Sequence, residues 1–220
     1  MSTILNDPYA NIDQSITITF PPHFKYPEDS KKYVIDWIPK LTKHLNRCIG
    51  IDNIVGIEIG SLYGGSSVFF LENILTGKNT TLYCIDTNTN EFLQNNLSVY
   101  PNAKFLQGLS GDILKTLTHN GSTKEFADFV YVDGSHIAFH VLEDAVFSWR
   151  LLKNNGIMIF DDYGWGFGAG EPNPAEITKT GVDAFLHGYK GLYNLIEGGW
   201  QVYLQKSVNI KTKYFTSSTS

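Results

Sequence analysis

The fold of this chain is decided by Phe129-Val130-Tyr131-Val132-Asp133 and, farther along, by Gly156-Ile157-Met158-Ile159-Phe160-Asp161-Asp162. Both runs are short, apolar and rich in β-branched and aromatic residues, which is typical of buried strands. A helical pattern separates them, with apolar residues recurring from Ala138 to Leu152 and with Asn155-Gly156 at its end. We therefore predict two neighbouring parallel strands, 129–132 and 156–160, joined by a helix in a β-α-β unit.

Each of these two strands ends in carboxylates, Asp133 after the first and Asp161 and Asp162 after the second. The carboxyl ends of parallel strands meet at one edge of the sheet, where open α/β folds bind ligands. Carboxylates that meet there repel one another unless a cation lies among them, and oxygen ligands suit Mg²⁺ or Mn²⁺. Helix capping or loop hydrogen bonding is the alternative, because Asp is common after strands. We favour a divalent metal site, because two separate strand ends supply the acids.

A glycine-rich turn follows the first expected strand, 55–59, and runs Gly60-Ser61-Leu62-Tyr63-Gly64-Gly65-Ser66-Ser67. Glycines let the backbone approach a ligand closely, and the N–H groups at the start of the next helix can face it. The second expected strand, 81–85, ends in Asp86, where nucleotide-binding α/β folds place a carboxylate that holds ribose hydroxyls. Capping is a close alternative for Asp86. Together the turn and the acid indicate a nucleotide-binding site.

The remaining pattern completes an α/β sheet. A short strand at 103–106 leads into Gly108-Leu109-Ser110-Gly111-Asp112 and a further helix. Residues 193–196 and 200–204 are expected to form a closing antiparallel hairpin through Gly198-Gly199. The Gly- and Pro-rich segment 163–174 follows the acids directly, so we expect a mobile substrate loop there.

The amino-acid composition excludes several classes of protein. With 220 residues and 42% hydrophobic content, the chain is long enough for one sizeable domain. The 22 acidic and 17 basic residues give a net charge of −5, which argues against nucleic acid or an anionic membrane as a partner. The two cysteines, Cys48 and Cys84, suggest neither a disulfide framework nor a zinc cluster. Because no signal peptide or membrane-spanning run is recognisable, we expect a soluble, cytoplasmic protein.

In this order the motifs resemble those of the class I S-adenosylmethionine-dependent methyltransferases. More narrowly, they are similar to the metal-dependent O-methyltransferases, the group of the catechol, caffeoyl-CoA and macrolide-sugar enzymes. The resemblance extends from Ile51 to Lys206. It implies a Rossmann-like, doubly wound α/β sheet of seven mostly parallel strands with a C-terminal antiparallel hairpin.

We accordingly expect three regions along the chain. Residues 1–50 form a Pro-containing arm with helices, which either covers a pocket or packs against the main domain. Residues 51–207 form the methyltransferase domain that the resemblance implies. The Ser- and Thr-rich residues 208–220 form a disordered tail.

The resemblance implies a binding site for S-adenosylmethionine. Its motif Glu-x-Gly-x-x-x-Gly, which cradles the methionine part, falls here on Glu58, Gly60 and Gly64, and Asp86 binds the ribose. A third motif, Gly-x-Ser-x-Asp, lies against the adenine and falls on 108–112, with an ordinary turn as a close alternative for Ser110. The cofactor-binding residues are therefore predicted to be Glu58, Gly60, Ser61, Gly64, Ser66, Asp86, Ser110, Gly111 and Asp133.

The resemblance also assigns Mg²⁺ or Mn²⁺ to Asp133, Asp161 and Asp162. Catechol-type enzymes have Lys three residues after the fourth-strand Asp, whereas this chain has His136, as sugar-modifying members can. Imidazole takes up a proton near neutral pH, so His136 is the predicted general base. The alternative is that His136 merely begins the following helix.

The implied reaction is methyl transfer from S-adenosylmethionine to a hydroxyl of a small acceptor, such as a sugar or a catechol-like molecule. An NAD-dependent oxidoreductase is less favoured, because Leu62 stands where Gly-x-Gly-x-x-Gly requires its second glycine. A cofactor-binding or partner protein without catalysis is the other alternative, and the intact acids speak against it. The sequence leaves a homo-oligomer open.

Overall fold

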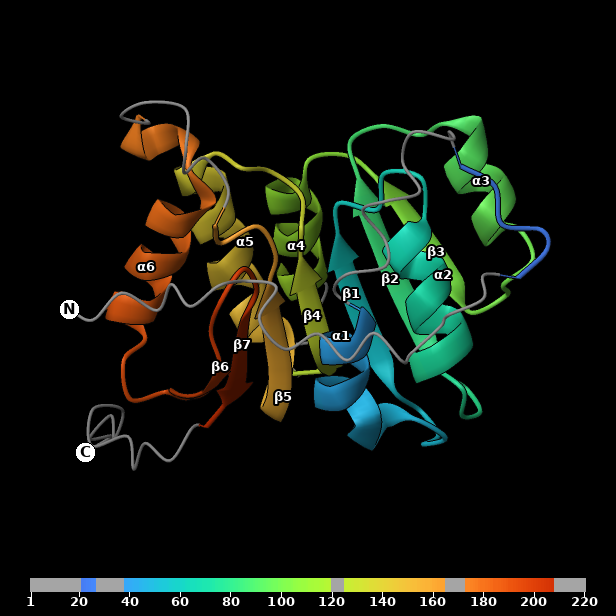
Figure 1. Cartoon of the computed structure of the whole chain (residues 1–220), viewed down its shortest axis with the longest axis horizontal. Coiled ribbons are helices and arrows are strands. Elements are labelled where there is room, and N and C mark those ends of the chain that lie inside the picture. The colour runs from blue at the N-terminus through green and yellow to red at the C-terminus, as the bar shows by residue number, and fades with distance from the viewer. Residues whose placement is uncertain (1–20, 27–37, 120–124, 165–172, 208–220) are drawn as a thin grey trace, which may run out of the picture.

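In the computed structural model, which describes residues 21–26, 38–119, 125–164 and 173–207, helices cover both faces of a seven-stranded sheet (Figure 1). The strands are β1 (Val55–Ile59), β2 (Thr81–Asp86), β3 (Ala103–Gln107), β4 (Ala127–Val132), β5 (Leu152–Phe160), β6 (Tyr193–Glu197) and β7 (Val202–Lys206). The helices are α1 (Ile38–Leu45), α2 (Gly65–Phe69), α3 (Glu91–Leu97), α4 (Ser110–His119), α5 (Ala138–Leu151) and α6 (Thr178–Gly188). A π-helical turn over Phe70–Ile74 extends α2, and 3₁₀ turns lie at Asn46–Cys48 and Pro174–Glu176.

The strand order across the sheet is β3-β2-β1-β4-β5-β7-β6, which Figure 1 displays from right to left. Strands β1 to β5 run parallel, whereas β7 runs antiparallel to its neighbours β5 and β6. The chain changes direction of winding between β1 and β4, and doubly wound sheets bind ligands beside this switch point. The predicted Rossmann-like sheet with a C-terminal antiparallel hairpin is confirmed.

Successive residues of the central strands point into two apolar cores, one on each face of the sheet. In β4, Phe129 and Tyr131 pack in the core that contains α1, α2 and α3, whereas Val130 and Val132 pack in the core that contains α4, α5 and α6. Strands covered on both faces need apolar side chains at every position. This requirement explains the uninterrupted apolar runs in the sequence.

The end of α5 differs from the prediction. The helical pattern was expected to continue through Leu152 to Asn155, whereas residues 152–155 belong to β5. Leu152 pairs with Ala127 of β4, so the chain passes from the helix into the sheet without a loop. The Lys206 ammonium donates to the carbonyl oxygens of Trp149 and Leu152, each at 2.7 Å, and these bonds satisfy carbonyls at the helix end.

The hairpin is also shifted relative to the prediction. Strand β7 begins at Val202 and not at residue 200, so Trp200 lies in the connection from β6 to β7. The backbone N–H of Tyr163 donates to the carbonyl oxygen of Trp200 at 2.8 Å. This bond ties the connection to the chain beyond β5.

Several predictions lie outside the described residues. They concern most of the arm 1–50, the centre of the loop 163–174, and the tail 208–220.

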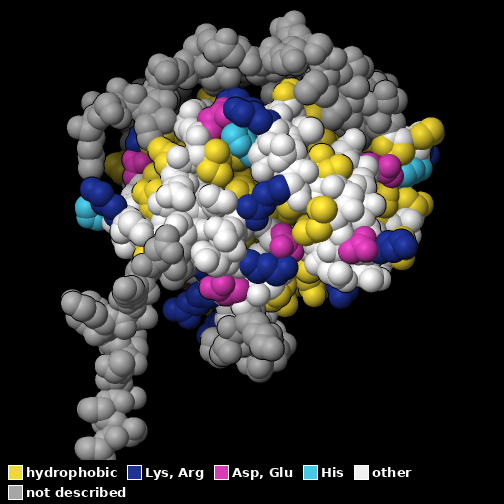
Figure 2. Space-filling model, turned by 90° about the horizontal axis from the view of Figure 1, so that it is seen from below, with side chains coloured by type: hydrophobic (Ala, Val, Ile, Leu, Met, Phe, Trp, Pro, Cys, Tyr) yellow, Lys and Arg dark blue, Asp and Glu magenta, His cyan; other side chains and the backbone are white. Residues whose placement is uncertain are grey.

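Figure 2 shows the molecule from below the view of Figure 1. On this face Lys and Arg lie beside Asp and Glu, and the described residues form no broad patch of positive or negative charge. Within the described ranges, none of the helices is long and apolar enough to cross a membrane.

Candidate functional site

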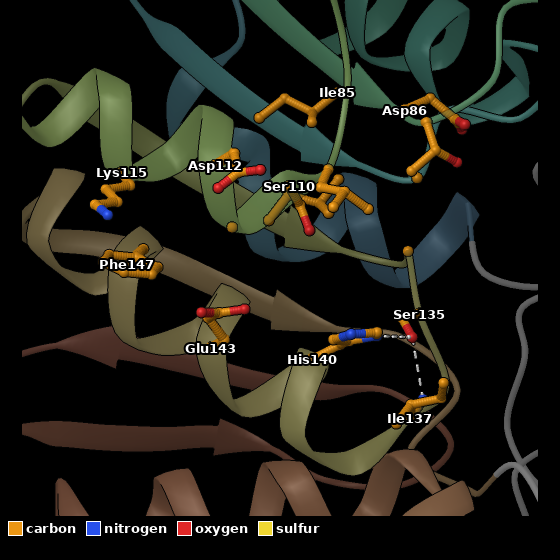
Figure 3. Close-up of a pocket in the computed structure, with 17 residues that line it drawn as sticks. Ile85, Asp86, Ser110, Asp112, Lys115, Ser135, Ile137, His140, Glu143 and Phe147 are labelled. Carbon is orange, nitrogen blue, oxygen red and sulfur yellow. Dashed lines mark hydrogen bonds between the residues drawn. The ribbon is translucent and has the colours of Figure 1, made fainter.

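A cavity of about 510 Å³ lies at the carboxyl edge of the sheet, beside the switch point between β1 and β4 (Figure 3). This volume is typical of small-molecule and cofactor sites. The loops after β1, β2, β3 and β4 form its wall together with one side of α5. Four of the predicted cofactor-binding residues line it: Gly60, Asp86, Ser110 and Gly111.

The glycine turn after β1 is packed against the loop after β4. Gly60 has a φ of 89°, and a Cβ atom at this position would lie 2.0 Å from the carbonyl oxygen of Asp133. A side chain would therefore force the two loops apart, which explains the glycine. Gly64, with a φ of 83°, precedes the first residue of α2 and serves the turn itself, outside the cavity lining.

Glu58 is fully buried behind this turn and is held by serine hydroxyls. Its Oε2 atom accepts hydrogen bonds from Ser61 Oγ, at 2.8 Å, and from Ser67 Oγ. Burial raises the pKa of Glu58, and hydrogen bonds from Ser66, Ser67 and Ser61 oppose the rise. The Oε1 atom is buried and has no hydrogen-bond partner among the described residues. Such an acceptor suits a ligand with an ammonium or N–H group.

Asp86 combines a structural role with a place in the cavity wall. Its Oδ2 atom accepts from the Leu62 N–H at 2.8 Å, and its Oδ1 atom accepts from the Asn88 N–H at 2.9 Å. Asp86 therefore fixes the turns after β1 and β2. Because a carboxylate has about four acceptor sites, each oxygen can also accept from a ligand hydroxyl. Ribose binding by Asp86 stays a prediction.

One wall of the cavity comes from α5 and was not predicted from the sequence. His140, Glu143 and Phe147 line it, and in Figure 3 they lie across the cavity from Ser110. Their spacing of three and four residues places them on one side of a helix, and this pattern is the signal that could have identified them. Gly111 gives Glu143 room, because a Cβ atom there would lie 2.8 Å from Oε2 of Glu143.

Ser110 also forms a hydrogen bond with a buried residue behind this wall, Asp144. Asp144 of α5 is only 1% exposed, and burial raises its pKa to about 7. A hydrogen bond from Ser110 stabilises the ionised form and limits that rise, while the charge of Glu143 adds to it. Ser110 therefore links the start of α4 to α5. Its predicted contact with an adenine ring is a second role that the geometry permits.

A cluster of possible metal ligands adjoins the cavity. One ligand atom each from Asp133, His136 and Asp162 lies within 4.8 Å of the others, and all three residues are partly exposed. His136 Nε2 and Asp162 Oδ2 are 2.9 Å apart. Burial raises the pKa of Asp133 well above its usual range, and the charges of Asp161 and Asp162 raise it further. A cation would relieve this repulsion.

The predicted ligand Asp161 has a different environment. It is 5% exposed, and its Oδ2 atom accepts from the Tyr131 hydroxyl while its Oδ1 atom accepts from the Asp162 N–H at 2.8 Å. Burial and the charge of Asp162 raise its pKa to about 6. The structure therefore brings Asp133 and Asp162 together with His136, and it places Asp161 directly behind them. Metal binding by these residues stays a prediction.

The comparisons with known proteins agree with this geometry. Residues 57–163, just under half of the chain, match a family model described as a methyltransferase domain. This stretch contains β1 to β5, the glycine turn and the acidic strand ends. No curated protein matches the chain.

Solved methyltransferases share the fold at low identity. The MycE methyltransferase of the mycinamycin biosynthetic pathway, solved with Mg and SAH, is 18% identical over 81% of this chain and 52% of its own, with a TM-score of 0.61. An O-methyltransferase from Bacillus cereus, solved with SAH, is 12% identical, with coverages of 86% and 84% and a TM-score of 0.57. TomG of Streptomyces achromogenes, an O-methyltransferase of tomaymycin synthesis solved with SAM, is 18% identical, with coverages of 84% and 83% and a TM-score of 0.58. The chain spans about half the length of MycE.

The sheet order and the matched domain together define a class I methyltransferase fold. Residues 57–163 match the methyltransferase domain model, and the predicted fold class is confirmed.

Proposed function

We propose that this protein transfers a methyl group from S-adenosylmethionine to a hydroxyl of a small acceptor, with the help of a divalent cation. One observation carries the proposal: the loop 133–136 belongs to both sites. Gly134 and Ser135 line the cavity, whereas Asp133 and His136 contribute to the ligand cluster. A methyl donor bound in the cavity and a methyl acceptor bound at the ligand cluster would therefore lie close together, separated by this one loop. Such positioning of two reactants lowers the barrier to group transfer.

The charge of the cavity supports S-adenosylmethionine as the donor. The cavity lining contains three acidic residues, Asp86, Asp112 and Glu143, and one lysine, Lys115. Behind the glycine turn, the Oε1 atom of Glu58 is a buried acceptor without a hydrogen-bond partner among the described residues. When bound, S-adenosylmethionine supplies a methyl group on a positively charged sulfur, and its ammonium group matches the surplus of carboxylates. The SAH and SAM in the MycE and TomG structures agree with this assignment.

The same features disfavour the alternative NAD-dependent oxidoreductase. The pyrophosphate of NAD binds at the N-terminus of a helix, where N–H groups and the helix dipole favour negative charge. In the helix after the glycine turn, α2, Ser66 and Ser67 of the first turn are hydrogen-bonded to the buried Glu58. Three carboxylates in the cavity would repel a pyrophosphate.

The ligand cluster supports a divalent cation. The carboxylates of Asp133 and Asp162 are oxygen ligands that suit Mg²⁺ or Mn²⁺, with water completing the shell. When bound, the cation supplies Lewis acidity that makes an acceptor hydroxyl easier to deprotonate. The Mg in the MycE structure agrees with this assignment.

Different residues of the chain then have different roles in the proposed reaction. The glycine turn and Asp86 hold the donor, Asp133 and Asp162 hold the cation, and the imidazole of His136 accepts the hydroxyl proton. The bond between His136 Nε2 and Asp162 Oδ2, at 2.9 Å, fixes the orientation of the ring and stabilises it once it is protonated. The acceptor class, a sugar or a catechol-like molecule, and the cytoplasmic location are part of the proposal.

Methyl transfer to a panel of acceptors tests the proposal. The purified protein is incubated with methyl-labelled S-adenosylmethionine and Mg²⁺, with sugars, catechols and matched amines as acceptors. We expect label on hydroxyl acceptors only, and its loss in EDTA. Label on amines, or transfer that persists in EDTA, would contradict hydroxyl specificity or metal dependence, respectively. If S-adenosylmethionine binds and no acceptor of the panel is labelled, a cofactor-binding protein without catalysis becomes the better account.

A further inference from the structure

The connection between β6 and β7 reaches the ligand cluster through Trp200. Strand β7 pairs antiparallel with β5, with Phe160 opposite Val202. Continuing this register by two residues places Trp200 opposite Asp162. The two segments stay hydrogen-bonded beyond the strands, because the Tyr163 N–H donates to the Trp200 carbonyl oxygen at 2.8 Å, one residue out of this register.

The Trp200 side chain binds the Asp162 carboxylate. Its indole Nε1–H donates to Asp162 Oδ1 at 2.9 Å, while Asp162 Oδ2 faces His136. The carboxylate is therefore held from two sides, one oxygen by each neighbour. Trp200 is 37% exposed, so its ring is not simply a member of the core.

Two backbone features fit this arrangement. Asp162 has a φ of 51°, a left-handed conformation that is costly for a residue with a side chain and is kept only where surrounding contacts impose it. Gly164 lies against the indole ring, because a Cβ atom there would be 2.6 Å from Cε3 of Trp200. A larger residue at 164 would push the ring away from Asp162.

We propose that Trp200 is a positioning residue for the metal site, acting through Asp162. This inference rests on the proposed function and extends it to the C-terminal hairpin. By holding Oδ1, the indole N–H leaves Oδ2 of Asp162 directed at His136 and Asp133. Groups that orient a metal ligand in this way fix its geometry and lower the cost of ordering it when the cation binds.

The test compares Trp200→Phe with Tyr163→Phe. Trp200→Phe keeps an aromatic side chain and removes the N–H donor, together with the outer part of the indole ring that lies against Gly164. Tyr163→Phe is the matched control, because it removes the hydroxyl donor to Asp183, 2.8 Å away, from the same segment without touching Asp162. Mn²⁺ affinity is measured from the electron paramagnetic resonance signal of free Mn²⁺, and SAH affinity by calorimetry.

We expect Trp200→Phe to weaken Mn²⁺ binding by about 10- to 100-fold, the usual effect of losing a group that orients a metal ligand. Its SAH affinity and its melting temperature in EDTA should equal those of the wild type, and Tyr163→Phe should bind Mn²⁺ as the wild type does. Equal Mn²⁺ affinity in Trp200→Phe and wild type would overturn the inference alone. If wild-type protein binds no Mn²⁺, the metal part of the proposed function fails as well. Should Trp200→Phe not fold, Trp200→Leu provides the same measurement.

Discussion

The two halves of the site differ in how their charges are stabilised. In the cavity, both oxygens of Asp86 already accept backbone N–H groups, so the fold itself stabilises that carboxylate. In the ligand cluster, burial and neighbouring charges raise the pKa values of Asp133 and Asp161. The charge in the cavity is therefore stabilised before any ligand binds, whereas the carboxylates of the ligand cluster would be stabilised by a bound cation. Donor binding and metal binding should be separable, although one loop carries both.

The largest expected effect comes from Asp133→Asn, which removes a charged ligand from the cluster. We expect a loss of about 10³-fold or more in metal-dependent turnover, because metal-ion catalysis is worth several kcal/mol. SAH affinity should change little, since Asp133 does not line the cavity and meets the glycine turn through its backbone carbonyl. Turnover with excess Mg²⁺ and SAH calorimetry measure the two effects. Wild-type activity of the variant in EDTA would refute the metal mechanism.

His136→Ala should also reduce turnover, with a pH dependence of its own. We expect a loss of about 10²- to 10⁴-fold near neutral pH, the usual value of a general base. The loss should shrink as pH rises, because hydroxide can then take the proton. A pH series of turnover measures this, with His187→Ala as a control, since His187 is exposed at the end of α6. A constant loss at every pH would mean that His136 positions the acceptor and is not its base.

The sheet could be predicted from the sequence because its signals are local. The runs at 129–132 and 156–160 are apolar throughout, as strands covered on both faces must be, and each ends in acid. The chain order of the motifs then gave the class of fold. The end of α5 was misplaced because Leu152 is apolar and fits either a helix or a strand. Its pairing with Ala127 decides the matter and is not local.

The candidate site was predicted only in part, for the same reason. Asp133, Asp162 and His136 follow strand ends directly, so topology alone brings them together. The separation of Asp161 from this group depends on Tyr131, whose hydroxyl reaches it from the neighbouring strand. The contact of Trp200 depends on the register of a hairpin about 40 residues farther along, which residue patterns do not specify.

A smaller effect is expected from Asp86→Ala, this time on the cavity half. Losing charge-assisted hydrogen bonds to ribose hydroxyls should weaken SAH binding by about 1.5 to 3 kcal/mol. Metal affinity should stay at the wild-type value. Because Asp86 also caps two backbone N–H groups, Asp86→Asn is the control that keeps an acceptor oxygen. Unchanged SAH affinity in Asp86→Ala, measured by calorimetry, would mean that Asp86 is only a cap.

The smallest effect concerns the stability of the metal-free protein. The pKa of Asp161 is about 6 in the folded state, against an ordinary value of 3.8. The folded state therefore binds more protons between these values, and its stability falls as pH rises through this range. Asp161→Asn removes the penalty and can still accept from Tyr131. We expect it to stabilise the metal-free protein by about 1 to 3 kcal/mol at pH 8 and hardly at pH 4. Urea unfolding in EDTA measures this, and a destabilised variant at pH 8 would contradict the account.

The separation of the two halves is tested most directly by titrating SAH into EDTA-treated protein in a calorimeter and repeating the titration with Mg²⁺. We predict that SAH binds the folded, metal-free protein, and that its affinity changes by no more than about twofold when Mg²⁺ is added, because the cavity groups already have their partners. Absence of binding heat in folded protein, with binding restored only by Mg²⁺, would contradict two separable sites that share the loop 133–136.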